Sequence, residues 1–255
     1  MSTLLGKRVL ITRAEEQSGV LKERLESRGA TTLVVPLLSF VKRTDARNVE
    51  LLSQLDHYDW VILTSTNGVR FYKELVEKYI GYFPSHLAYA AVGKKTEQAL
   101  KKEGLHVAFV PSEFTGEALV EEWVPKLREE ERVLYIRGNR SKSTLPEGMK
   151  KQRISFDSMT AYDTLIVEEN GNRLRQVFEH DGVDAVTFFS PSQVEAFVEL
   201  IGDYSEEALG LPCFCIGPTT EKSASKSGFQ EVYTPSTYTA EALIDRMEEH
   251  FNEKG

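Results

Sequence analysis

The chain contains 255 residues, a length that fits one large domain or two small ones. Hydrophobic residues make up 41% and charged residues 27%, a balance typical of globular proteins and unlike that of disordered or fibrous chains. The net charge of −8 excludes a general nucleic-acid-binding surface, and no apolar run approaches the roughly 18 residues of a membrane helix.

The first half of the chain alternates short apolar runs with amphipathic segments. Val9–Ile11 predicts a strand, and residues 16–28 predict a helix that Gly29 closes at its C-terminal end. The alternation continues with strands over 61–63, 87–92 and 107–110, and with helices over 68–79, up to Gly104, and from Gly116 to about Leu127. This alternation predicts parallel strands with helices on both faces of a sheet.

The second half of the chain repeats the first at an offset of 124 residues. Arg8-Val-Leu-Ile-Thr-Arg13 recurs as Arg132-Val-Leu-Tyr-Ile-Arg137. Further matches follow in the same order: Asp59–Ser65 with Asp184–Ser190 (offset 125), Ala91–Gly93 with Cys215–Gly217, Val110-Pro111 with Thr234-Pro235, and Glu117–Leu119 with Glu241–Leu243. Matches in one order along the chain predict a tandem duplication of one supersecondary unit.

The predicted fold class is α/β, with two doubly wound parallel-sheet lobes from that internal duplication. Two long connectors, 36–47 and 155–169, contain extended runs near 37–42 and 158–167 that can pair as a two-stranded antiparallel linker. Such a linker leaves the first strand–helix unit with the C-terminal half of the chain. We therefore expect one discontinuous lobe, residues 1–37 with 167–255, and a second lobe, residues 38–166, which includes the linker strands.

Polar residues occupy the loops after the predicted strands, where open parallel sheets bind their ligands. The candidate substrate-binding residues in these loops are Thr12, Arg13, Ser65, Thr66, Asn67, Gly93, Lys94, Thr115, Gly116, Arg137, Gly138, Ser190, Pro191, Ser192, Gly217, Pro218, Thr219, Thr220 and Thr239. One interpretation is helix capping alone, because Thr12-x-x-Glu15 and Ser190-x-x-Gln193 have capping-box spacing. The other is a receptor for several carboxylates or phosphates, built from helix N-termini and nearby basic side chains between two lobes.

Familiar catalytic and cofactor motifs are absent from the sequence. No dinucleotide-binding Gly-x-Gly-x-x-Gly or nucleophile-elbow Gly-x-Ser-x-Gly occurs, and Gly93-Lys94-Lys95-Thr96 lacks the first glycine of a P-loop. Cys213 and Cys215 are expected to be buried, reduced thiols in a strand. The histidines lack metal-ligand spacing, so no metal site is expected. The N-terminus has the features of neither a signal nor a transit peptide, which predicts a cytoplasmic protein.

A set of short sequence pieces carries a family resemblance. The most specific are Ala161-Tyr-Asp-Thr164 and Ile216-Gly-Pro-Thr-Thr220. The others are Val9–Arg13, Trp60–Val69, Ala91–Gly93, Phe114–Gly116, Leu134–Gly138, Phe189–Ser192 and Tyr238–Leu243. In this order and spacing, and over nearly the whole length, the chain resembles the uroporphyrinogen-III synthase family of tetrapyrrole (haem) biosynthesis.

The resemblance implies an enzyme that closes hydroxymethylbilane, a linear tetrapyrrole with many carboxylates, into uroporphyrinogen III. The terminal pyrrole ring is inverted through an azafulvene and a spiro intermediate, water is released, and no metal or organic cofactor takes part. Tyr162 matches the family's candidate for assisting departure of the hydroxyl, and the alternative is a linker tyrosine packed between the lobes. Thr219 and Thr220 match a binding loop, although helix-capping threonines have the same appearance in the sequence.

The resemblance also implies a monomer without nucleic-acid or membrane partners, and it leaves open a transient contact with the preceding enzyme of the pathway. The alternative from another functional class is a non-catalytic, cytosolic, two-lobed binding protein for a polyanionic metabolite. The isomer of the macrocycle formed from hydroxymethylbilane separates these two hypotheses, because uncatalysed closure gives the non-inverted isomer.

Overall fold

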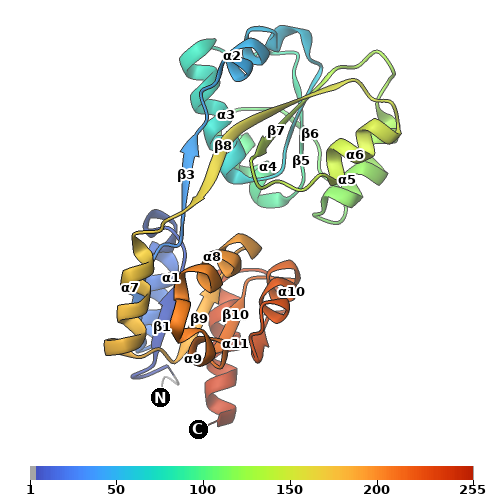
Figure 1. The fold of residues 1–255 in the computed structure, drawn as a ribbon. Coiled ribbons are helices and arrows are strands. Elements are labelled where there is room, and N and C mark those ends of the chain that lie inside the picture. Colours follow the sequence, from blue (N-terminus) through green and yellow to red (C-terminus); the bar gives the residue numbers. More distant parts are fainter. Residues whose placement is uncertain (1–3, 255) are drawn as a thin grey trace. The chain divides into compact units, whose positions relative to one another are not determined.

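The computed structural model describes residues 4–254 and divides the chain into two compact units (Figure 1). Unit 1 comprises the chain up to Ser39 together with the part from Leu165 onward, and unit 2 comprises Phe40–Thr164. Each of these borders lies two residues from the one expected from the sequence. Within residues 4–254, no helix has the length and apolar character needed to cross a membrane.

Unit 1 is built on a five-stranded parallel sheet. Its strands are β1 (Arg8–Ile11), β2 (Thr31–Val34), β9 (Ala185–Phe188), β10 (Pro212–Cys215) and β11 (Glu231–Tyr233), in the order β11-β10-β9-β1-β2. Every neighbouring pair is parallel. The central strand β9 is buried along its whole length, and Cys213 and Cys215 are free and buried in β10, as predicted.

Helices cover both faces of this sheet. They are α1 (Glu15–Ser27), α7 (Asn170–Gln176), α8 (Pro191–Ile201), α9 (Ser205–Leu209), α10 (Pro218–Lys226) and α11 (Ala240–Lys254). Leu25 of α1 and Ile244 of α11 share one apolar cluster with β1, whereas Leu174 of α7 and Phe197 of α8 belong to the cluster on the opposite face. The unit is therefore doubly wound, as predicted.

Unit 2 contains a six-stranded sheet with one atypical edge. Its strands are β3 (Leu38–Lys42), β4 (Trp60–Leu63), β5 (Ala88–Ala91), β6 (Val107–Phe109), β7 (Val133–Gly138) and β8 (Phe156–Ile166), in the order β3-β8-β7-β4-β5-β6. The Arg43 amide donates to the Ala161 carbonyl, and the Val167 amide donates to the Leu37 carbonyl. Residue numbers thus rise along β3 as they fall along β8, so these adjacent strands (Figure 1) run antiparallel.

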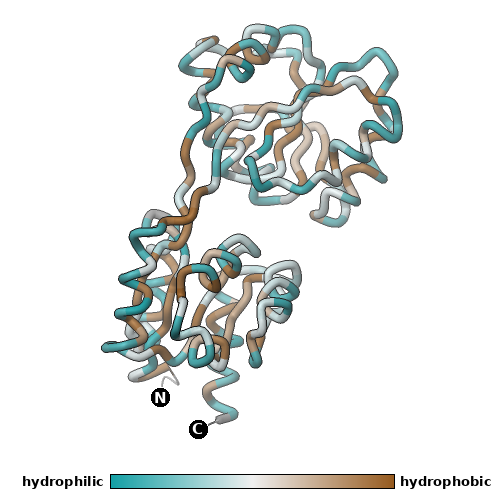
Figure 2. Tube along the Cα trace, in the orientation of Figure 1, coloured by the Kyte–Doolittle hydropathy of each residue, from teal (hydrophilic) through white to brown (hydrophobic). Residues whose placement is uncertain are grey.

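The helices of unit 2 also lie on both faces of its sheet. They are α2 (Ala46–Ser53), α3 (Thr66–Tyr79), α4 (Lys94–Lys102), α5 (Gly116–Glu122) and α6 (Thr144–Lys151). Leu75 of α3 and Leu100 of α4 pack on one face, and Leu119 of α5 and Met149 of α6 pack on the other. Figure 2 shows apolar residues gathered along the strands of each unit.

Several helix boundaries differ from the sequence-based expectation. Helix α1 begins and ends one residue earlier than expected, with Arg28 as its C-terminal cap residue. Helix α3 begins at Thr66, two residues early, because the hydroxyl of Ser65 caps it. Helix α5 ends at Glu122, and a 3-10 turn over Val124–Lys126 follows, because Pro125 lacks the amide that would continue the α-helical hydrogen bonding.

The two sheets have the same strand order once strands 124 or 125 residues apart are equated. Under that equivalence β4, β5, β6 and β7 correspond to β9, β10, β11 and β1, and β8 corresponds to β2. The order β6-β5-β4-β7-β8 of unit 2 then matches the order β11-β10-β9-β1-β2 of unit 1. A duplicated supersecondary unit would produce this match, and the common origin of the halves remains a prediction from the sequence.

Candidate active site

In unit 2 the end of β4 carries a serine with two partners. The Oγ atom of Ser65 accepts the amide of Gly68 at 3.0 Å and so caps α3. The same Oγ lies 3.1 Å from the hydroxyl of Tyr162, which comes from β8. Since β4, β7 and β8 are parallel, their carboxyl ends meet at one edge of the sheet, and this edge brings the two hydroxyls together.

The ring of Tyr162 is held in a tight apolar setting. It stacks on Phe71 of α3 with ring centroids 5.3 Å apart, and Phe40 of β3 meets it edge-on at 6.0 Å. Gly138, at the end of β7, is its neighbour in the sheet, and a Cβ atom there would lie 2.6 Å from the Tyr162 Cζ atom. Position 138 therefore needs glycine so that the phenol can lie against the backbone.

Burial raises the pKa of Tyr162 above its ordinary value, while the hydrogen bond with Ser65 and the charge of Arg70 act in the opposite direction. The phenol is therefore neutral at physiological pH. A neutral phenol donates a hydrogen bond without carrying charge, and this is the property that a donor to a leaving oxygen requires. Tyr162 is 7% exposed as a residue, so little of it meets bulk water.

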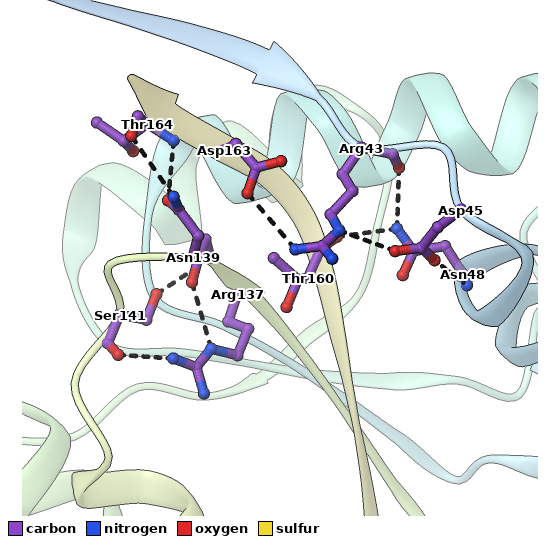
Figure 3. A network of polar contacts seen from close by, with 10 residues as sticks. Arg43, Asp45, Asn48, Arg137, Asn139, Ser141, Thr160, Asp163 and Thr164 are labelled. Atoms are coloured by element: carbon purple, nitrogen blue, oxygen red, sulfur yellow. Dashed lines mark hydrogen bonds and ion pairs between the residues drawn. The ribbon is translucent and has the colours of Figure 1, made fainter. Parts of the chain in front are cut away.

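A turn after β7 fixes the backbone on either side of this tyrosine (Figure 3). The amide of Asn139 donates to the Tyr162 carbonyl, and the amide of Thr164 donates to Asn139 Oδ1 at 2.8 Å. The Arg137 guanidinium donates to the carbonyls of Gly138 and Ser141, at 3.2 and 2.7 Å. Two donors of Arg137, a predicted anion ligand, are thus engaged in bracing the turn, which leaves its remaining donors for a ligand.

A second polar group in Figure 3 holds β8 from the side of α2. Arg43 donates to Asp45 at 2.8 Å and lies 3.6 Å from Asp163, the residue after Tyr162. Asn48 of α2 donates to the carbonyl of Thr160 at 2.8 Å. The sequence pattern did not single out Asp163 or Asn139 as positioning residues, although Asp163 lies within the Ala161–Thr164 motif and Asn139 follows Gly138.

Two further strand ends of unit 2 lie on the same edge of the sheet. Gly93 precedes α4 and offers no side chain to cap it, and the ammonium of Lys94 lies 5.6 Å from the centre of the Phe114 ring. The Oγ1 atom of Thr115 accepts the amide of Ala118 at 3.1 Å and caps α5. The Thr115 hydroxyl therefore caps α5, whereas the backbone amides in the first turn of α4 have no side-chain cap.

The first strand end of unit 1 corrects one sequence-based prediction. Thr12 is fully buried, and its hydroxyl donates to the Thr187 carbonyl of the neighbouring strand, so it neither caps α1 nor faces a ligand. Ala14 is the N-cap residue instead. Arg13 donates to Gln17 at 2.9 Å and lies 4.9 Å from the Phe189 ring centre, and burial lowers the pKa of this guanidinium.

The predicted capping box at Ser190 is also wrong. Ser190 occupies the N-cap position of α8, but its side chain makes no capping hydrogen bond. Gln193 reaches back one residue further than in a capping box, and its Oε1 atom accepts the amide of Phe189 at 2.7 Å. The backbone amides at the start of α8, with Pro191 and Ser192 in its first turn, thus lack a side-chain cap.

The loops after β10 and β11 of unit 1 resemble those after β5 and β6 of unit 2 in how the next helix is capped. Gly217 precedes α10 without capping it, and Pro218 begins the helix. Thr219 is exposed, whereas Thr220 is buried at 3% exposure, so only Thr219 can present its side chain to a ligand. Thr239 accepts the amide of Ala242 at 3.2 Å and caps α11, as Thr115 caps α5.

The predicted site residues therefore fall into two classes. Ser65 and Gly138 both lie against Tyr162 within unit 2. The others lie at separate strand ends of the two sheets, where Thr66, Asn67 and Gly116 occupy first turns of helices. Among residues 4–254, no group of three or more His, Cys, Asp or Glu side chains is placed to hold a metal ion.

Comparison with known sequences identifies relatives over nearly the whole chain. The family model described as uroporphyrinogen-III synthase HemD matches residues 6–245. A porphyrin biosynthesis protein HemD of Ruminiclostridium josui is 29% identical over 96% of this chain, which spans 48% of that longer protein. A uroporphyrinogen-III synthase of Synechococcus elongatus is 25% identical, with 96% of each chain covered.

Solved structures share the fold. A mutant uroporphyrinogen III synthase from Thermus thermophilus aligns with a TM-score of 0.71 and 22% identity, over 98% of this chain and all of the other. A uroporphyrinogen-III synthetase from Helicobacter pylori aligns with a TM-score of 0.64 and 17% identity, over 96% of this chain and 99% of that one. These matches support the α/β fold with two mostly parallel sheets.

Proposed function

The chain belongs to the uroporphyrinogen-III synthase family, and from that premise we propose that it cyclises hydroxymethylbilane to uroporphyrinogen III. The reaction expels water and inverts the terminal pyrrole ring, so the proposed enzyme is a cyclising lyase. We further propose that it acts as a monomer. The observation that supports the proposal most directly is the contact between Ser65 and Tyr162 at the sheet edge of unit 2.

Tyr162 supplies the donor in the first step. Its phenol donates a hydrogen bond to the departing hydroxyl oxygen, the C–O bond breaks, and the pyrrole nitrogen of the same ring gives up its proton. The hydroxyl and that proton leave as water, and the ring becomes an azafulvene. Ser65 holds the phenol oxygen at 3.1 Å, and Phe71 and Gly138 confine the ring. A donor fixed by its surroundings loses little freedom when the transition state forms, which is how positioning accelerates a reaction.

The inverted product requires attack through the substituted carbon of the terminal ring, which gives the spiro intermediate. Uncatalysed closure occurs but yields the non-inverted isomer, so the protein must stabilise one geometry more than the other. No strong acid or base is needed for that selection. The role of the protein is to hold a flexible, multiply charged chain in the conformation that leads to the spiro intermediate.

The substrate carboxylates bind to the uncapped helix N-termini. Helices α4, α8 and α10 begin at strand ends and have no side-chain hydrogen bond at the N-cap. Their first amides carry partial positive charge and lack intrahelical partners. Lys94 and Arg13 add formal positive charge at the ends of β5 and β1, in a chain whose net charge is −8.

Isomer-resolved turnover tests the proposed function. Purified protein, treated with a metal chelator, is mixed with freshly prepared hydroxymethylbilane, and the products are oxidised and separated by chromatography. We expect the inverted isomer to form far faster than the spontaneous product. If the protein bound the bilane but only the non-inverted isomer formed at the spontaneous rate, the chain would be a binding protein and the proposal would be wrong.

A further inference from the structure

Two exposed aromatic side chains occupy equivalent positions in the two units. Phe114 and Tyr238 are 124 residues apart, the repeat offset, and their exposed fractions are 51% and 54%. Both lie in the loop after the edge strand, β6 in unit 2 and β11 in unit 1. Large apolar side chains left in water at matching places in two separate sheets indicate a shared role, because neither sheet needs them for its core.

The backbone around the two rings is also the same. The amide of Thr115 donates to the Glu113 carbonyl at 2.8 Å, and the amide of Thr239 donates to the Thr237 carbonyl at 2.8 Å. Each aromatic residue is therefore the central residue of a three-residue turn. Both threonines then cap the next helix through their hydroxyls. The turn and the cap fix the loop, so each ring is presented in a defined place.

Each ring lies beside a glycine that precedes an uncapped helix. A Cβ atom at Gly93 would lie 3.5 Å from the Phe114 Cβ atom, and a Cβ atom at Gly217 would lie 3.5 Å from the Tyr238 Cγ atom. Gly93 and Gly217 are the N-cap positions of α4 and α10, which have no side-chain capping bond. Each unit thus places a flat apolar surface next to helix amides that favour a carboxylate.

This combination matches a pyrrole ring with acidic substituents, so we propose that Phe114 and Tyr238 are substrate-positioning residues. Each stacks on one pyrrole ring of the bilane while a carboxylate of that ring reaches the adjacent helix N-terminus. In unit 2 the Lys94 ammonium, 5.6 Å from the Phe114 ring centre, adds positive charge beside the same carboxylate. The proposal rests on the proposed function, since it assigns part of the binding of that substrate.

Conservative and disruptive substitutions distinguish stacking from a structural role. Phe114→Leu and Tyr238→Leu keep apolar bulk and remove the flat ring, whereas Phe114→Tyr and Tyr238→Phe retain it. Tyr82→Leu is the matched control, because Tyr82 is 52% exposed and lies between α3 and β5, at the opposite edge of the sheet from the strand-end loops. Steady-state kinetics, product affinity and the product isomer ratio are measured for the wild type, these five variants and the double variant Phe114→Leu/Tyr238→Leu.

We expect each leucine variant to raise KM and to weaken product binding roughly three- to tenfold, a loss expected for one aromatic stack. The ring-retaining variants should recover the wild-type KM, and kcat should change less than KM in every case. The double leucine variant should also release more of the non-inverted isomer. Thermal unfolding of all variants should match the wild type, since the rings are exposed.

The wild-type assay separates the two proposals. If the wild type forms no inverted isomer, the proposed function fails and the variants are not informative about catalysis. If the wild type is active but both leucine variants, like Tyr82→Leu, keep the wild-type KM and product affinity, the positioning role of Phe114 and Tyr238 is wrong. Loss of activity together with a lowered unfolding temperature would also overturn it, because that outcome makes the rings structural.

Discussion

The two units share a strand order, yet among residues 4–254 the contact between a serine and a tyrosine hydroxyl at a sheet edge lies in unit 2. Ser65 caps α3 and contacts Tyr162, whereas Ser190, 125 residues later, makes no capping bond. The residue 124 positions before Tyr162 is Leu38, which is buried and apolar. Helices begin at strand ends in both units, whereas the Ser65–Tyr162 hydroxyl pair lies in unit 2. We therefore propose the chemical step for unit 2.

The hydrophobic cores of the two units also differ in which aromatic residues they contain. The five buried tyrosines of the described chain, Tyr58, Tyr72, Tyr89, Tyr135 and Tyr162, all lie in unit 2. Five of the six buried phenylalanines among the described residues lie in unit 1: Phe178, Phe188, Phe197, Phe214 and Phe229. A buried hydroxyl needs a hydrogen-bond partner, so the core of unit 2 depends more on buried side-chain hydrogen bonds, and it should lose stability where tyrosines ionise.

Adding a methyl group at Gly138 should produce the largest loss. In Gly138→Ala the new Cβ would lie 2.6 Å from the Tyr162 ring, so the ring or β8 must move. We expect activity to fall by more than the roughly 10²-fold that loss of a general-acid donor alone would cost. Stability should fall by about 1–3 kcal/mol from overpacking. Kinetics and thermal unfolding measure both effects.

Gly19→Ala in unit 1 is the control for that substitution. Gly19 lies within α1 with no atom within 4 Å of its added Cβ. Alanine there should stabilise the helix by about 0.5–1 kcal/mol and leave turnover unchanged. Wild-type activity in Gly138→Ala would show that the phenol does not need the place that this glycine leaves open.

Serine-to-alanine substitutions at the equivalent positions should have unequal effects. Ser65→Ala removes both the cap of α3 and the partner of the Tyr162 hydroxyl, so we expect turnover to fall about tenfold and stability by about 1 kcal/mol. Ser190→Ala removes no capping bond and should change either quantity only slightly. Equal losses of turnover in the two variants would remove the distinction between the units.

Raising the pH should weaken unit 2 through its tyrosines. Burial raises the pKa of Tyr89 to about 12 and that of Tyr72 well above its ordinary value, whereas unfolded tyrosines ionise near 10. The stabilising contribution is complete below pH 10 and is lost as the pH rises above it, because the unfolded chain then releases protons first. Both tryptophans, Trp60 and Trp123, lie in unit 2, so their fluorescence reports on its unfolding.

The midpoint of the fluorescence-detected urea transition should stay level to about pH 9.5 and fall steeply above it. Burial also raises the pKa of the Cys213 thiol in unit 1, so that unit should begin to lose stability nearer pH 9. Cys213→Ala should remove this earlier loss from the circular dichroism signal without moving the fluorescence transition. A fluorescence midpoint that is constant to pH 11 would contradict the account of the unit 2 core.

The threonine caps should give the smallest effect and the same one in both units. Thr115→Ala and Thr239→Ala each remove one hydroxyl that accepts a helix amide, which costs about 1 kcal/mol. Denaturant unfolding checks whether the two losses agree within error. If only one variant lost stability, the two caps would not contribute equally to the free energy of unfolding.

The sequence predicts the strand ends well because strand–helix alternation fixes a parallel sheet, and parallel strands share an edge. The sequence does not predict that the Thr12 side chain is buried, because a threonine after a strand can either cap a helix or donate to a buried carbonyl. The requirement for glycine at position 138 depends on the register shift between β7 and β8, which no local pattern encodes. Phe114 and Tyr238 were within reach, because the repeat offset relates them.

The central claim is that the phenol of Tyr162 assists the chemical step while both units bind the substrate. A single-turnover comparison of wild type with Tyr162→Phe tests it directly, because phenylalanine keeps the stacking on Phe71 and removes only the hydroxyl. We predict that the rate of product formation falls on the order of 10²-fold while product affinity stays unchanged. Wild-type turnover in Tyr162→Phe would contradict the claim and would leave positioning alone to account for catalysis.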